Sequence, residues 1–208
     1  MKIKPSLLPA FTTNEYRLII QPHEDLCNKI NQIKKSFAET YQLPVYRYAK
    51  PCITLVRFTQ YEMMEEKIIR RLKNITSVNA SFTVELKDFG SFPTHSIFIN
   101  VATKTNIVAL IKELKSVQKL MKLDDEHKPH FITEPYINIA AKLLPWQYEK
   151  GWLQYSNTPF VALFVANEIQ LEKRKIGEQK YHAVQRFQLS ADAGNVTMKS
   201  RTAQLSFF

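Results

Sequence analysis

Glycine is scarce in this chain. The 208 residues contain four glycines, and no two of them are close in the sequence. A P-loop and a dinucleotide-binding fingerprint both need closely spaced glycines to bring backbone N–H groups against phosphates. Both of these nucleotide-binding motifs are therefore excluded.

Cysteine is also rare, and long apolar runs are missing. The two cysteines, Cys27 and Cys52, cannot form a disulfide framework, and no Cys/His spacing indicates zinc, so neither a metal nor another cofactor is expected. No apolar run approaches the ~18 residues that a transmembrane helix needs. The apolar stretch at residues 7–11 is too short for a signal-peptide core. We therefore expect a cytoplasmic protein with no membrane partner.

Positive charge is what the chain has in excess. It carries 29 Lys and Arg against 19 Asp and Glu, a formal net charge of +10. A basic surface favours polyanions through phosphate contacts and counterion release. This points to RNA or a nucleotide as partner, with DNA not expected. The alternative is a basic protein that has no nucleic-acid partner.

Strand and helix patterns alternate along the chain. Apolar residues recur at helical spacing in four segments and at strand spacing in seven. The residues 88–91 (Asp-Phe-Gly-Ser) have turn chemistry. The order predicts two α+β lobes related by approximate duplication. The expected strands are 16–22, 52–58, 82–87, 97–101, 136–140, 160–175 and 180–189, and the expected helices are 23–42, 62–74, 106–121 and 144–152.

Two of these strands carry similar motifs. Residues 51–55 read Pro-Cys-Ile-Thr-Leu and residues 135–139 read Pro-Tyr-Ile-Asn-Ile, with the second residues 84 positions apart (136 minus 52). The period of two in a strand places the second and fourth residues of each motif on one face. If the lobes are duplicated, these four side chains converge on one concavity between them.

The motif pair resembles the twin Pro-His-Ile-Thr-Leu strands of the two-histidine (2H) phosphoesterases, which include 2′-5′ RNA ligase-like proteins and cyclic nucleotide phosphodiesterases. The resemblance covers about residues 14–189, with residues 1–13 as an extension and 190–208 as a tail. It implies a bilobal, duplicated α+β fold in which two antiparallel-rich sheets flank a central cleft, with helices on the outside.

The resemblance also implies residue roles. Cys52 and Tyr136 stand where the family has the histidines that act as general acid and base, and Thr54 and Asn138 stand where hydroxyls hold the phosphate. Unperturbed Cys and Tyr have pKa values of about 8.5 and 10, against about 6.5 for His. Neighbouring Lys and Arg can depress a thiol pKa. Three readings follow: a cleft without catalysis, a thiol-dependent activity, or a weak residual phosphoesterase.

Basic residues near the motifs are candidates for an anion clamp. These are Arg47, Lys50 and Lys142, of which Lys142 shares face parity with the second motif. Arg57 has the opposite parity to Cys52 and is expected to point away from the cleft. The alternative for each is a solvated surface charge.

The five histidines offer no replacement for the missing pair. His130 precedes the nearest threonine by three positions, so a strand would place the two on opposite faces, and we expect it to be structural. His95 and His182 fall in expected hairpin strands, and His23 falls at a helix start.

The sequence therefore predicts a 2H phosphoesterase-like domain that has lost its catalytic histidines and binds a nucleotide, an RNA end or another phosphorylated ligand in the cleft. The first alternative is an active 2′,3′-cyclic phosphodiesterase or RNA ligase-like enzyme with altered residues. The second alternative is a protein-interaction module.

Overall fold

The computed structural model describes residues 12–43 and 50–191 of the chain. None of the helices in these ranges is long and apolar enough to cross a membrane. The strands are β1 (Thr13–Ile20), β2 (Ile53–Tyr61), β3 (Phe82–Phe92), β4 (Ser96–Val101), β5 (His130–Phe131), β6 (Tyr136–Ala141), β7 (Val161–Ala166), β8 (Glu168–Lys175) and β9 (His182–Gln188). The helices are α1 (Glu24–Thr40), α2 (Glu65–Val78), α3 (Lys104–Leu114), α4 (Gln118–Met121) and α5 (Pro145–Tyr155), with short 3-10 turns η3 (Glu62–Met64) and η4 (Lys115–Val117).

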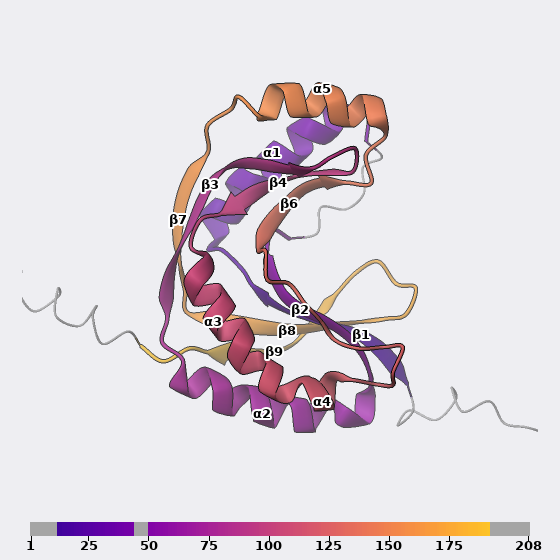
Figure 1. Cartoon of the computed structure of the whole chain (residues 1–208), viewed down its shortest axis with the longest axis vertical. Helices are drawn as coiled ribbons and strands as arrows, with labels where there is room; N and C mark the ends of the chain where they lie inside the picture. Colours follow the sequence, from indigo (N-terminus) through magenta and orange to yellow (C-terminus); the bar gives the residue numbers. More distant parts are fainter. Residues whose placement is uncertain (1–11, 44–49, 192–208) are drawn as a thin grey trace, which may run out of the picture.

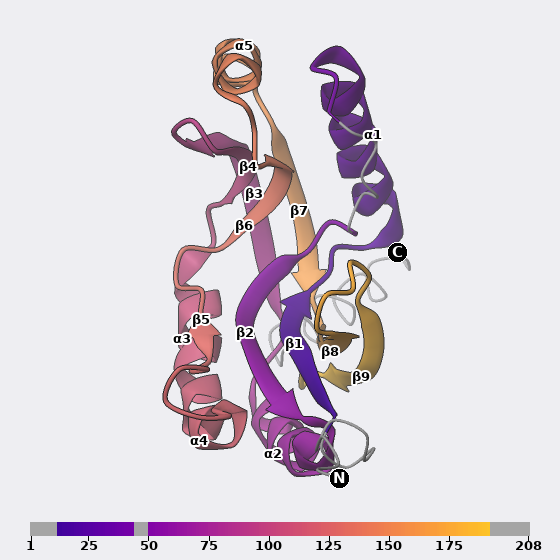
Figure 2. The same cartoon turned by 90° about the vertical axis from the view of Figure 1, so that its right-hand side faces the viewer.

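Two antiparallel sheets form two lobes. The first sheet has the strand order β5-β2-β1-β8-β9, and the second has the order β6-β4-β3-β7. In Figure 1, α1 and α5 lie with the second sheet at one end of the molecule, and α2 and α4 lie with the first sheet at the other end. Figure 2, turned by 90°, shows the same division along the long axis. The expected bilobal α+β fold is confirmed.

Helical segments cross between the two lobes. The chain between β1 and β2 of the first sheet runs through α1, which contacts β6 of the second sheet. The chain between β4 and β6 of the second sheet runs through α3 and α4, which contact β2 of the first sheet. Each lobe therefore packs against a helix that leaves the other lobe, and the buried apolar side chains form one continuous core.

Aromatic packing joins α1 to α5. The ring centroid of Phe37 lies 4.6 Å from that of Tyr41 and 5.4 Å from that of Tyr155. Phe37 is fully buried because the apolar stripe of α1 faces the second lobe. The α5 helix approaches so closely at Gly151 that a Cβ atom there would lie 2.7 Å from the Phe37 ring. The position of α1 thus depends on the absence of a side chain at residue 151.

The structure corrects two expected elements. Residues 160–175 are not one strand, because the chain changes sheet at Asn167, between β7 and β8. The residues 88–91, expected as a turn, lie inside β3, where the pairing with β4 is irregular and Asp88 has a φ of 56°. Asp adopts a positive φ more readily than most residues. The residue that suggested a turn therefore lies in a β-bulge instead. The hairpin turn lies farther on, where the His95 N–H donates to the Phe92 carbonyl at 3.0 Å.

The expected domain limits lie close to the ends of the described part of the chain. Ser190, the first residue of the expected tail, pairs with Ala80 in an isolated parallel bridge. The remainder of the tail from residue 192, and residues 1–11 of the expected extension, lie outside the described residues.

The close approach of α5 to α1 predicts an unusual effect of Gly151→Ala. Ala is the better helix former by about 1 kcal/mol, so a gain in stability is the simple expectation for a helical Gly. We expect a loss of about 1–3 kcal/mol instead, because the new methyl group overlaps the buried Phe37 ring. Thermal unfolding measures the change, with Leu153→Ala as the control, since Leu153 lies in the same helix and is 74% exposed. A stabilised Gly151→Ala protein would contradict this packing.

Candidate functional site: a cationic cavity between the two sheets

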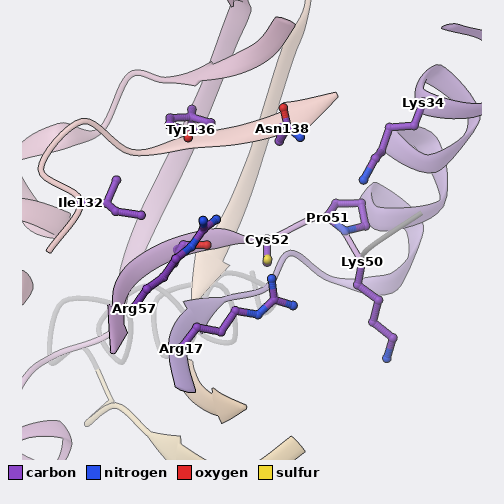
Figure 3. A pocket seen from close by; sticks show the side chains of 10 residues that line it. Arg17, Lys34, Lys50, Pro51, Cys52, Arg57, Ile132, Tyr136 and Asn138 are labelled. Atoms are coloured by element: carbon purple, nitrogen blue, oxygen red, sulfur yellow. The ribbon is translucent and has the colours of Figure 1, made fainter. Parts of the chain in front are cut away.

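The four motif side chains surround one cavity between the lobes. Its volume is about 130 Å³. Figure 3 shows Cys52 on one side, with Tyr136 and Asn138 along the strand on the opposite side. The expected convergence of the two motifs is therefore what the structure shows. The described residues that line the cavity are Arg17, Lys34, Lys50, Pro51, Cys52, Thr54, Arg57, Ile132, Tyr136 and Asn138.

A β-bulge in β2 brings Arg57 into this cavity. Thr54 pairs with Ile19 and Val56 pairs with Leu18, so Leu55 is an extra residue with no partner of its own on β1. An extra residue shifts the alternation of side chains by one position. Thr54 and Arg57, three positions apart, consequently both line the cavity. The expectation that Arg57 points away was wrong, because strict strand parity does not hold across the bulge.

A second bulge has the opposite effect on Lys142. Asn138 pairs with Phe98 and Ala140 pairs with Ile97, so Ile139 is the extra residue in β6. Parity with the second motif is therefore lost beyond residue 139. Lys142 follows the strand, is exposed and has a φ of 56°, and it is not among the residues that line the cavity.

Arg17 is one of two cations that sequence reasoning missed, and its side chain is held in place by several contacts. Its Nε donates to Glu172 Oε2 at 2.7 Å, and its guanidinium carbon lies 4.0 Å from the centre of the Tyr181 ring. The other carboxylate oxygen of Glu172 accepts from Gln170 Nε2 at 3.0 Å. The pair is mostly buried, with side-chain exposures of 11% for Arg17 and 8% for Glu172. The contacts with Glu172 use Nε and Nη2, so the Nη1 edge of a fixed guanidinium remains for the cavity.

The register of β1 explains the place of Arg17. Arg17 is the direct partner of Arg57 on β2 and of Glu172 on β8. The three residues therefore form one row across the first sheet on the side of the cavity. No local pattern in the sequence marks this row, because it depends on the pairing of β1 with both β2 and β8, and Arg17 and Glu172 lie 155 positions apart.

Two lysines come from the region where α1 meets the first motif. Lys34, on α1, is 9% exposed and its side chain extends toward the cavity in Figure 3. Burial lowers the pKa of this ammonium group. Lys50, a candidate from the sequence, precedes the first motif and also lines the cavity. Arg47, the other candidate nearby, lies outside the described residues.

The Cys52 thiol is not activated. Burial raises its pKa, and the Arg17 guanidinium offsets only part of this effect. Sequence reasoning allowed that neighbouring cations would depress the thiol pKa, but the structure gives the opposite direction. The thiolate is therefore a minor species near neutral pH. Cys27, the other cysteine, is buried and donates to the Pro22 carbonyl at 3.2 Å.

Tyr136 closes the cavity from the second sheet. Its ring centroid lies 4.8 Å from that of Phe98 and 5.4 Å from that of Phe92, with the Phe92 ring edge-on. The side chain thus belongs to a small aromatic cluster as well as to the cavity wall. Asn138, two positions on along β6, presents an amide that can donate and accept hydrogen bonds.

The histidines lie outside the cavity lining. His130 is exposed and is the partner of Arg57 across the short β5–β2 pairing. His23 is the N-cap of α1, where its Nδ1 accepts from the Leu26 N–H at 3.4 Å. His95 lies in the β3–β4 turn and His182 begins β9. Among residues 12–43 and 50–191, no three His, Cys, Asp or Glu side chains are grouped so that they could hold a metal ion.

Several solved structures have a similar fold. The crystal structure of E. coli LigT complexed with 3′-AMP matches with a TM-score of 0.57 and 13% identity, over 86% of this chain and 99% of LigT. LigT in apo form gives a TM-score of 0.59 and 15% identity, over 86% and 98% of the two chains. The protein TT0787 of Thermus thermophilus gives 0.59 and 13%, over 86% and 99%. At such identities these likenesses show the fold alone.

Comparison of sequences identifies the family. No curated protein sequence matches this chain significantly. The sequence model of the 2′-5′ RNA ligase superfamily, however, matches residues 22–178, a range that includes both motif strands and most of the lining of the cavity. The chain therefore belongs to the 2′-5′ RNA ligase superfamily.

Proposed function

We propose that the cavity binds the phosphate group of a nucleotide, an RNA end or another phosphorylated ligand, and that it does so without catalysis. The observation that carries this proposal is the make-up of the lining. Its described residues include four cations, two hydroxyl groups (Thr54 and Tyr136) and an amide, and no imidazole is among them. Cations and hydrogen-bond donors suffice to hold phosphate oxygens. Moving protons near pH 7 requires a group that titrates there.

The family and the relatives support a nucleotide as ligand. E. coli LigT has been crystallised with 3′-AMP and with phosphate. This chain shares the fold, and its cavity lies between the strands that carry the two family motifs. Its formal charge of +10 adds long-range attraction for an anionic ligand.

The alternative is an active phosphoesterase that uses Cys52 and Tyr136 in place of imidazoles. Each positioned acid or base is typically worth about 10²–10⁴ in rate, so the loss of both would remove most of the acceleration. The raised pKa of the Cys52 thiol works against its use as a base, because little thiolate forms near neutral pH. This alternative predicts measurable hydrolysis of a cyclic phosphodiester, whereas the binding proposal predicts negligible hydrolysis.

Binding is tested by titrating the protein with 3′-AMP in low and moderate salt. Affinity should fall as salt rises, because cations that neutralise phosphate charge release counterions. Lys50→Glu should weaken binding at least about threefold at low salt, since residue 50 lines the cavity. Lys142→Glu should have the smaller effect, and Lys73→Glu, an exposed change on the distant helix α2, serves as the control for net charge. No binding at low salt would favour a protein-interaction module.

Catalysis is tested with 2′,3′-cyclic nucleotides. We expect negligible hydrolysis by the natural protein, because neither motif position supplies a group that is both acid and base near pH 7. The double change Cys52→His with Tyr136→His should restore some turnover if the cavity keeps its shape. Robust turnover by the natural protein that disappears in Cys52→Ala or Tyr136→Phe would support altered chemistry. His130→Ala provides a parallel check on the histidine nearest to Arg57.

The state of the Cys52 thiol can be measured directly. In a Cys27→Ala background, the rate of alkylation by iodoacetamide should keep rising with pH beyond about 9, because burial raises the thiol pKa above its ordinary value and alkylation requires the thiolate. Cys52→Ala in the same background gives the blank. A rate that levels off near pH 7 would show a thiolate at neutral pH and would revive the thiol-dependent reading.

A further inference from the structure

We propose that β7, the outer strand of the second sheet, pairs with β7 of a second copy of this chain and forms a weak, two-fold symmetric dimer. The pairing is antiparallel and joins the second sheets of the two copies, with four strands each, into one continuous sheet. This inference does not rest on the proposed function. It rests on an unprotected sheet edge, on an exposed apolar face and on the self-complementary order of the residues in β7.

The two sheets have four edge strands in the described part of the chain, and three of them carry a feature that limits pairing with another chain. β5 is two residues long. β6 and β9 each contain a bulge, at Ile139 and at Val184. Very short edge strands and bulges are ways in which natural sheets avoid edge-to-edge association. The fourth edge strand, β7, has neither feature.

β7 is a regular and uncharged edge strand. It pairs with β3 in an unbroken register of six residue pairs, from Phe82 opposite Ala166 to Lys87 opposite Val161. All six of its residues are apolar, and none is a Lys or a Pro, which natural sheets use to block an edge. Within residues 12–43 and 50–191, no strand pairs with the far side of β7. The N–H and C=O groups on that side can therefore pair with an added strand.

One face of β7 is apolar and yet open to solvent. Val161, Leu163 and Val165 are 61%, 59% and 51% exposed, whereas Phe164 and Ala166, on the other face, are buried. Alternate residues of a strand point to one face, so the three exposed side chains form a stripe along the edge. An apolar stripe beside an unpaired backbone edge is typical of a surface to which another strand adds.

β7 itself has the properties of the strand that fits this edge. In an antiparallel pair with a two-fold axis at Leu163, each Val161 lies opposite Val165 of the other copy, and the two Leu163 side chains face each other. Such directly opposed side chains on one face are the contacts that stabilise a sheet. No charged side chain lies in either β7, so the pairing brings no like charges together. A second copy is therefore the occupant that the residues of β7 favour.

The dimer leaves the cationic cavity open. The second sheet has the order β6-β4-β3-β7, so the added strand lies at the edge opposite to β6, which carries Tyr136 and Asn138 (Figure 1). None of the residues of β7 lines the cavity. Pairing through β7 therefore blocks neither of the two cavities, and dimer formation and ligand binding can be measured separately.

Self-association is measured by sedimentation equilibrium of the full chain. We expect the average mass to rise toward twice the monomer mass between about 5 and about 500 µM, since a six-residue edge gives a small, weak interface. Each copy has a formal charge of +10, so added salt should strengthen the dimer by screening the repulsion. Binding of a phosphate group has the opposite salt dependence. A monomer at all of these concentrations in moderate salt would overturn the proposal.

Charge changes at Leu163 test the symmetry axis. Leu163→Lys and Leu163→Glu should each weaken the dimer at least about tenfold, because like charges then lie directly opposite each other. A mixture of the two variants should recover the association, because opposite charges meet. Ile176→Lys, an equally exposed change between β8 and β9 of the other sheet, is the control and should leave the dimer unchanged. An unaffected dimer in Leu163→Lys, or a mixture that stays monomeric, would overturn this pairing.

Hydrogen exchange identifies the surface that is covered. Amide exchange in residues 161–166 should slow as the natural protein is concentrated, and should not depend on concentration in Leu163→Lys. Equally strong protection at all concentrations would show that another segment of the chain covers β7, and would overturn the dimer. Leu163→Lys should bind 3′-AMP as the natural protein does, since Leu163 does not line the cavity. A monomeric protein that binds 3′-AMP would overturn the dimer and leave the proposed function standing.

Discussion

One extra residue in β2 determines which side chains line this cavity. Because Leu55 has no partner of its own on β1, the alternation of side chains shifts between Thr54 and Arg57, and both reach the same space. Arg57 then stands directly opposite Arg17, whose own charge is balanced by Glu172 on the next strand. Two neighbouring guanidinium groups repel each other unless a carboxylate or a bound anion lies between or beside them. The bulge therefore places two cationic side chains next to each other in the first sheet, where a bound anion would stabilise them.

Under the proposed function, the same cavity binds a phosphate group without catalysing a reaction on it. Binding a phosphate requires charge and oriented donors, and the row of Arg57, Arg17 and Glu172 supplies both on a rigid sheet. Catalysis also requires proton transfer. Of the two side chains that the motif resemblance assigns to the family's histidine positions, Cys52 has its pKa raised by burial and Tyr136 packs within an aromatic cluster. We infer that a member of this family can keep the cations and donors that hold a phosphate group after losing the side chains that transfer protons.

Sequence reasoning anticipated the parts of this structure that depend on local periodicity. Alternation every two residues and apolar spacing of three to four residues predicted the motif strands and the bilobal fold. They also predicted that Cys52 and Tyr136 line one cavity. It failed where one residue interrupts a pattern, as at Leu55, because a bulge leaves no clear mark in a single sequence. It also missed Arg17 and Lys34, whose roles come from pairing and helix crossing between segments distant in the chain. Strand alternation therefore predicted the face of a side chain correctly within each motif and incorrectly beyond the bulges.

The central claim, binding without turnover, can be tested in one sample by ³¹P NMR. The protein is mixed at stoichiometric concentration with a nucleoside 3′-phosphate and the corresponding 2′,3′-cyclic phosphate, and spectra are collected over a day. The account predicts that the monoester resonance shifts or broadens with added protein, while the area of the cyclic phosphate resonance stays constant. Steady loss of the cyclic phosphate resonance, or two resonances unaffected by the protein, would contradict it.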